Sequence, residues 1–220
     1  MKIRHHFDDA TLMAYSSGSL PQGMAVLVGS HLHWCDECRE RVSQTDRIGG
    51  DLLEAIEPVA MEPDALASIM ALIDQPEPEQ KLRSLSSDRL DSARTGLPLP
   101  LASMLGSSLD ELDWRRIGYG VQQYDLKLDG PGATRLLRIA PGVSVPHHTH
   151  RGNELTLILR GSYSDELGRF CVGDVADVDT EVKHQPIVDT DEECICLIAT
   201  DAPLKFTGLM GRLAQPFIGL

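Results

Sequence analysis

The chain has 220 residues, of which 42% are hydrophobic and 24% charged, values typical of a folded globular protein. Its formal net charge is -13, and residues 1–80 hold fourteen Asp and Glu against five Lys and Arg. Such an acidic surface repels phosphate backbones, which disfavours direct nucleic-acid binding and suits a basic protein partner, although acidity alone more often serves solubility.

The first residues, MKIRHHFDDA, reach charged side chains where a signal peptide would have its apolar segment. No apolar run approaches the roughly 20 residues that span a membrane. We therefore expect a cytoplasmic protein without membrane contact. In that reducing compartment the five cysteines are expected to be metal ligands, redox sensors or buried apolar residues rather than disulfides.

Residues 8–74 predict four helices. The first is capped by Asp8 or Asp9 and ends near Gly18, the second starts at Pro21 and runs towards His31, and the third covers about 36–56.

The fourth predicted helix begins at Pro63 and carries apolar residues with the spacing i, i+3, i+4 and i+7. This apolar stripe either packs on the other helices or contacts a partner. Its members are Leu66, Ile69, Met70 and Ile73.

Proline and polar residues without a sustained period follow over about 75–105. From Trp114 onward, short segments bounded by Gly, Pro, Asp or Asn predict strands of an all-β sandwich or barrel. We therefore expect a helical domain over 1–80, a linker over 81–105, and a β domain over 106–220 with a C-terminal tail.

The stretch HLHWCDEC contains a candidate metal site. On a helix, His31, Cys35 and Cys38 share one face, and they also converge if Asp36 caps a new helix, whereas His33 points away. A structural zinc site needs a fourth ligand, and spacing alone leaves His5 and His6 equally suitable. The alternative is that these residues are free, buried or incidental.

A second cluster, GVSVPHHTHRGNELTLILRG, lies in the β region. Strand alternation places His148, His150 and Glu154 on one face, and a neighbouring strand of a small barrel can bring His184 to the same cavity. Three imidazoles and a carboxylate suit Zn, Mn, Fe or Ni with open coordination positions. The alternative is a barrel whose histidines bind nothing.

Two further cysteines, Cys194 and Cys196, lie on one strand and share a face. They are either a redox pair or simple packing residues, and packing is the more common outcome for such buried thiols.

The arrangement of His6 followed by His31, Cys35 and Cys38 resembles the zinc anti-sigma module, whose members bind and occlude extracytoplasmic function sigma factors. The resemblance implies His6 as the fourth zinc ligand, a zinc-fixed three-helix core, and a fourth helix that wraps the sigma factor.

The spacing Gly142-x5-His148-x-His150-x3-Glu154-x6-Gly161 is identified as the first cupin motif. The second cupin motif is degraded: Gly168 and Gly173 are present, but Cys171 stands where the family often has Pro, and the Asn after the histidine is absent. The resemblance assigns His148, His150, Glu154 and His184 to one metal.

A zinc anti-sigma module followed by a cupin barrel is the layout of the ChrR-type anti-sigma regulators. The resemblance implies no enzymatic turnover. It implies a negative regulator of transcription that forms a 1:1 complex with its sigma factor and releases it when the cupin responds to singlet oxygen or organic peroxide. The competing prediction is a metal-dependent cupin dioxygenase or isomerase with an accessory helical domain.

Overall fold

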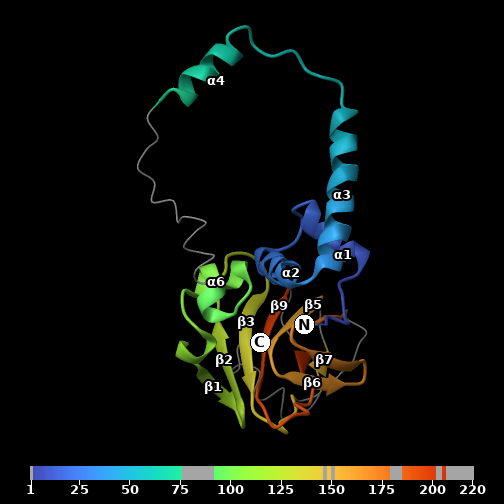
Figure 1. The fold of residues 1–220 in the computed structure, drawn as a ribbon, viewed down its shortest axis with the longest axis vertical. Coiled ribbons are helices and arrows are strands. Elements are labelled where there is room, and N and C mark those ends of the chain that lie inside the picture. Colours follow the sequence, from blue (N-terminus) through green and yellow to red (C-terminus); the bar gives the residue numbers. More distant parts are fainter. Residues whose placement is uncertain are drawn as a thin grey trace.

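The computed structural model describes residues 2–75, 92–145, 148–149, 152–178, 185–201 and 205–206. It begins with the four predicted helices, which are α1 (Asp9–Ser16), α2 (Gln22–Trp34), α3 (Asp36–Glu54) and α4 (Ala65–Ile73) (Figure 1). Helix α1 begins after Asp8 because the Asp8 carboxylate caps it, accepting a hydrogen bond from the Thr11 backbone N–H at 2.7 Å.

The last part of the range predicted as a linker, 81–105, forms helix α6 (Leu99–Leu105). Its residues Leu101 and Ala102 are fully buried, and the helix packs against α2. Pro100 suits a first helical turn, and Gly106, with φ of +63°, ends the helix in the left-handed region. A short 3-10 helix, Leu109–Glu111, leads from there into the strands.

Most strands form one six-stranded antiparallel sheet in the order β1-β2-β3-β9-β5-β8. Two small antiparallel pairs, β6-β7 and β4-β10, complete the described strands. The bounds are β1 (Arg115–Gly118), β2 (Val121–Asp125), β3 (Ala133–Ile139), β4 (His148–Thr149), β5 (Glu154–Arg160), β6 (Ser162–Asp165), β7 (Gly168–Cys171), β8 (Val175–Val178), β9 (Cys194–Thr200) and β10 (Lys205–Phe206). This arrangement confirms the predicted helical domain followed by a cupin-like β domain.

The two faces of the large sheet bury different partners. One face, which includes Leu136, Leu157 and Leu197, belongs to the same apolar core as α2 and α6. The opposite face, which includes Leu137, Ile158 and Cys196, packs with Tyr163 and Phe170 of the β6-β7 hairpin. Both sides of the central strands are therefore covered, which explains the nearly continuous apolar sequences of β5 and β9.

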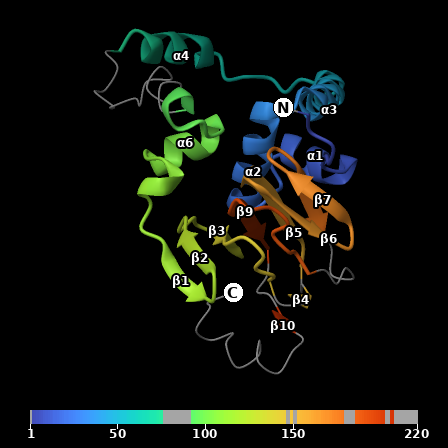
Figure 2. The same cartoon turned by 60° about the horizontal axis from the view of Figure 1, so that its bottom comes forward.

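Helix α2 lies on the sheet, whereas α3 projects from it and α4 stands apart from the rest of the molecule (Figures 1 and 2). None of the side chains of α4 is buried. Within the described ranges, no helix has both the length and the apolar character required to cross a membrane.

Candidate metal centre and surrounding sites

Four side chains from three parts of the helical region meet at one point. The potential ligand atoms of His6, His31, Cys35 and Cys38 all lie within 4.8 Å of one another. The two cysteines and His31 are buried, and His6 is partly exposed. Two imidazoles and two thiols suit a tetrahedral zinc-type site, so this group could hold a metal ion.

The junction between α2 and α3 sets the positions of the two cysteines. Cys35 ends α2 and begins α3 with an extended backbone (φ -106°, ψ 105°), so the motif forms a helix-to-helix turn rather than one continuous helix. The Cys35 sulfur accepts a hydrogen bond from the Cys38 backbone N–H at 3.4 Å. Cys35 itself, rather than Asp36, occupies the cap position, and both thiols consequently face the same side.

The imidazoles approach these thiols with one nitrogen each. His31 Nε2 lies 3.3 Å from Cys38 Sγ, and His6 Nδ1 lies 3.3 Å from Cys35 Sγ and 3.6 Å from Cys38 Sγ. Their other nitrogens face oxygen atoms: His31 Nδ1 is 2.9 Å from the Gly173 carbonyl oxygen, and His6 Nε2 is 3.4 Å from Glu37 Oε2. Outer oxygen partners of this kind orient metal-binding histidines and fix their tautomers.

Burial also shifts the pKa values of His31 and Cys38. It lowers the pKa of His31 to about 4, so the imidazole is neutral near pH 7 and a nitrogen lone pair is available to a metal. Burial and the neighbouring Cys35 raise the pKa of Cys38 to about 11. A bound cation would therefore displace the Cys38 proton, and metal binding would be coupled to proton release.

The remaining histidines of this region point elsewhere. The His5 ring stacks on Phe170 with ring centroids 4.3 Å apart, and its Nε2 lies 3.1 Å from the Arg169 carbonyl oxygen. His33 is exposed on α2, as its helical phase predicts. The structure thus brings His6 rather than His5 to the two thiols. Glu37, beside His6, lies within the HLHWCDEC motif, but spacing alone gave no reason to single it out.

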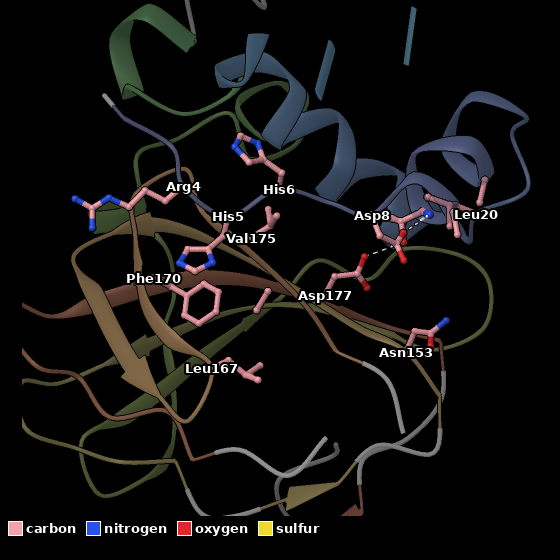
Figure 3. A pocket seen from close by; sticks show the side chains of 14 residues that line it. Arg4, His5, His6, Asp8, Leu20, Asn153, Leu167, Phe170, Val175 and Asp177 are labelled. Atoms are coloured by element: carbon pink, nitrogen blue, oxygen red, sulfur yellow. Dashed lines mark hydrogen bonds between the residues drawn. The ribbon is translucent and has the colours of Figure 1, made fainter. Parts of the chain in front are cut away.

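A cavity of about 750 Å³ adjoins the site between the N-terminal segment with α1 and strands β7 and β8 (Figure 3). His6 lines it and is therefore the ligand candidate closest to solvent. The Thr11 hydroxyl of α1 donates a hydrogen bond of 2.8 Å to the Asp177 carboxylate of β8, which joins the two sides of the cavity. Its labelled lining residues carry both signs of charge, with Arg4 at one end and Asp8 and Asp177 at the other (Figure 3).

The predicted second metal set is described only in part. Glu154 begins β5 and is buried, with 2% of its surface exposed. His148 begins β4, where its backbone pairs with Phe206 of β10. His150 and His184 lie outside the described residues, so the convergence of this set remains a prediction.

Cys194 and Cys196 lie on β9, facing the interior of the β domain, and both are buried free thiols. A hydrogen bond with Cys194, together with burial, raises the pKa of Cys196 well above its ordinary value. These surroundings favour the protonated thiol, which packs well but is a poor nucleophile. A redox role for the pair remains a prediction.

The comparisons with known proteins agree with this architecture. A family profile described as the ChrR cupin-like domain matches residues 103–203. The anti-sigma-E factor ChrR of Cereibacter sphaeroides is 44% identical over 217 residues, covering 99% of this chain and 99% of that protein. The crystal structure of Rhodobacter sphaeroides SigE in complex with the anti-sigma ChrR matches with 42% identity and a TM-score of 0.76, covering 91% of this chain and 100% of that chain. The chain therefore belongs to the ChrR family of anti-sigma factors.

Proposed function

We propose that this protein binds an extracytoplasmic function sigma factor as a 1:1 complex and blocks its access to RNA polymerase. The observation that carries this proposal is an uncovered apolar surface. Of the sixteen exposed large apolar side chains in the described residues, eleven lie between residues 48 and 73. We call nine of them, all on or directly beside α3 and α4, the α3–α4 surface: Ile48, Leu52, Leu53, Ile56, Leu66, Ile69, Met70, Leu72 and Ile73.

A surface of this kind is characteristic of a helix that a partner covers. An amphipathic helix commonly places its apolar face in a partner's groove, and both α3 and α4 leave large apolar side chains uncovered. The four residues expected to contact the partner, Leu66, Ile69, Met70 and Ile73, are each about half exposed or more. A similar ChrR has been crystallised with SigE, and that supports a sigma factor as the partner.

The charge of the helical region supports the same partner. Residues 1–80 are strongly acidic, and a sigma factor presents basic surfaces for DNA and polymerase. Complementary charge accelerates association and disfavours wrong partners. The proposal also implies a cytoplasmic location, because the sigma factor acts in the cytoplasm, and a regulatory rather than a catalytic role.

We further propose that His6, His31, Cys35 and Cys38 bind a structural zinc ion. The convergence of their donor atoms and the neutral His31 imidazole fit that ion. Helices α1 and α2 have only 8 and 13 residues, and a closed zinc site would stabilise their arrangement with the start of α3.

The cupin-like domain is proposed to make the complex conditional. His148, His150, Glu154 and His184 would hold zinc or another divalent metal such as Mn, Fe or Ni, and a reactive oxygen species would act there to release the sigma factor. The cupin motif and the burial of Glu154 support this assignment.

The test is co-expression of the full chain with the sigma factor encoded beside its gene. We expect a stable 1:1 complex, and we expect Ile69→Asp with Met70→Asp to weaken binding at least about tenfold, because interface anchors commonly contribute more than ~1.4 kcal/mol each. The matched control is Leu167→Asp, since Leu167 is 50% exposed in the β6-β7 turn while Ile69 is 48% exposed. Absence of a complex, or equal binding by both variants, would contradict the proposal.

The same purified complex tests release. Organic peroxide or singlet oxygen should dissociate the wild-type complex, and the Glu154→Gln complex should persist under the same treatment. Release that is unchanged by Glu154→Gln would remove the cupin metal from the mechanism while leaving sigma binding intact.

A further inference from the structure

The four residues of the proposed zinc site are held by two different parts of the chain. The thiols are positioned by the α2–α3 junction, whereas the β domain contacts the His31 imidazole and the backbone that leads into His6. We propose that the turn between β7 and β8, through the Gly173 carbonyl and the Asp174 carboxylate, positions His31 and His6 for the metal. This inference rests on the proposed zinc site, and it makes Gly173 and Asp174 positioning residues rather than ligands.

The first contact orients His31. Its Nδ1 donates to the Gly173 carbonyl oxygen at 2.9 Å, and its ring is fully buried. Because Nδ1 then carries the proton, Nε2 is left as the unprotonated nitrogen, and it lies 3.3 Å from Cys38 Sγ. The β domain thereby fixes both the tautomer and the direction of this imidazole.

The second contact holds the segment that leads into His6. Asp174 is completely buried, and its Oδ1 accepts hydrogen bonds from the backbone N–H groups of Arg4 at 2.7 Å and His5 at 3.1 Å. The Val175 N–H donates to the His5 carbonyl oxygen at 3.4 Å. Hydrogen bonds to a buried carboxylate are among the stronger ones, so the backbone directly before His6 is tied to the β domain.

The turn itself is rigidly attached to the sheet. Asp174 Oδ2 accepts from the Cys171 N–H at 2.9 Å, which closes the turn. The Gly173 N–H donates to the Ile158 carbonyl oxygen at 2.9 Å, and the Ile158 N–H donates to the Asp174 carbonyl oxygen at 3.1 Å. Ile158 lies on β5, the strand that starts with Glu154. The His31 imidazole and the backbone directly before His6 are thus connected by hydrogen bonds to a central strand of the β domain.

The experiment measures metal binding by the full-length protein. The Asp174→Asn substitution replaces one carboxylate oxygen with an NH₂ group of the same size, which donates and cannot accept. Either the bonds from the Arg4 and His5 N–H groups or the bond from the Cys171 N–H then loses its acceptor. We expect zinc affinity, measured by chelator competition, to fall about 10- to 100-fold, which is typical when an outer partner of a metal ligand is removed. The absorption bands of the Co²⁺-substituted protein should shift as well, because the ligand geometry changes.

The matched control is Asp189→Asn. Asp189 also accepts hydrogen bonds within the β domain, from the hydroxyls of Ser162 at 2.8 Å and Ser164 at 2.7 Å, and it pairs with Arg169 at 2.8 Å. These are side-chain contacts within the β domain, and His5 contacts Arg169 at its backbone carbonyl rather than at its side chain, so zinc affinity and the Co²⁺ spectrum should match the wild type.

The outcomes distinguish failure of the zinc site from failure of the positioning role of Gly173 and Asp174. A wild-type protein that binds no zinc would overturn the zinc site itself. A wild type that binds zinc, with Asp174→Asn binding equally well or Asp189→Asn losing as much, would overturn the inference alone.

If Asp174→Asn does not fold, hydrogen exchange of the wild type decides. Because coupling between two sites is reciprocal, zinc should slow exchange at residues 171–175 and leave residues 162–165 unchanged. Equal exchange at 171–175 with and without zinc would overturn the inference.

Discussion

Helices α2 and α4 have similar apolar sequences and opposite surroundings. In α2, the side chains of Met24, Leu27, Val28 and Leu32 are all less than a tenth exposed, because the helix lies on the sheet. In α4, every large apolar side chain is about half exposed or more. Composition therefore predicts that both helices bury apolar side chains against other protein surface. Only the fold shows that α2 does so within the chain and that α4 does not.

The difference has an energetic meaning. Burying apolar surface stabilises by roughly 25 cal/mol per Å², so α2 contributes to the stability of the folded chain and α4 contributes very little. The apolar surface of α4 instead remains available for association. In the proposed function, folding therefore depends on α2 and partner binding on α4, two helices of the same small region.

The largest effect expected from this comparison is at Leu27. This residue is completely buried between α2 and the sheet, so Leu27→Ala should lower the free energy of unfolding by about 2–5 kcal/mol. Urea unfolding followed by far-ultraviolet circular dichroism measures it. Leu167→Ala, at a half-exposed position, should change stability by less than about 0.5 kcal/mol. A small change at Leu27 would mean that α2 is not held on the sheet in solution.

A middle-sized effect is expected where α2 approaches β3. A Cβ added at Gly23 would lie 1.8 Å from the Thr134 hydroxyl oxygen, so Gly23→Ala should force α2 away from the sheet and destabilise by about 1–3 kcal/mol.

The second substitution Thr134→Ala removes that oxygen and leaves the Thr134 Cβ position at 3.1 Å, so the double variant should recover part of the loss. Thermal unfolding of the single and double variants measures this coupling. Purely additive losses would contradict a close contact between Gly23 and Thr134.

Local spacing predicted helices α1 to α4 and the convergence of His31, Cys35 and Cys38, for a physical reason. Caps, apolar periods and the spacing of His31, Cys35 and Cys38 depend on residues within one or two turns of each other. Helix α6 was missed because seven residues that include Pro100 show no sustained period.

The contacts that join the helical region to the β domain had no comparable signal. His31 and Gly173 are 142 residues apart, and the Gly-Asp pair at 173–174 has the composition of any tight turn. The choice of His6 over His5 likewise depends on this docking, since His5 stacks on Phe170 of β7. Sequence spacing therefore identifies which residues can bind a metal, but not which distant backbone orients them.

The smallest effect on stability is expected at Leu66, and this position tests the contrast between α2 and α4 most directly. Leu66→Ala is the same chemical change as Leu27→Ala, but Leu66 is 71% exposed, so the unfolding free energy of the chain alone should change by less than about 0.5 kcal/mol. With the sigma factor bound, the same variant should lose affinity, because the deleted side chain then contributes to a buried interface. Urea unfolding of the free chain and titration with the sigma factor measure the two values. A loss in the free chain as large as that of Leu27→Ala would mean that α4 folds back onto its own chain, and the α3–α4 surface would then not be the free binding surface that we propose.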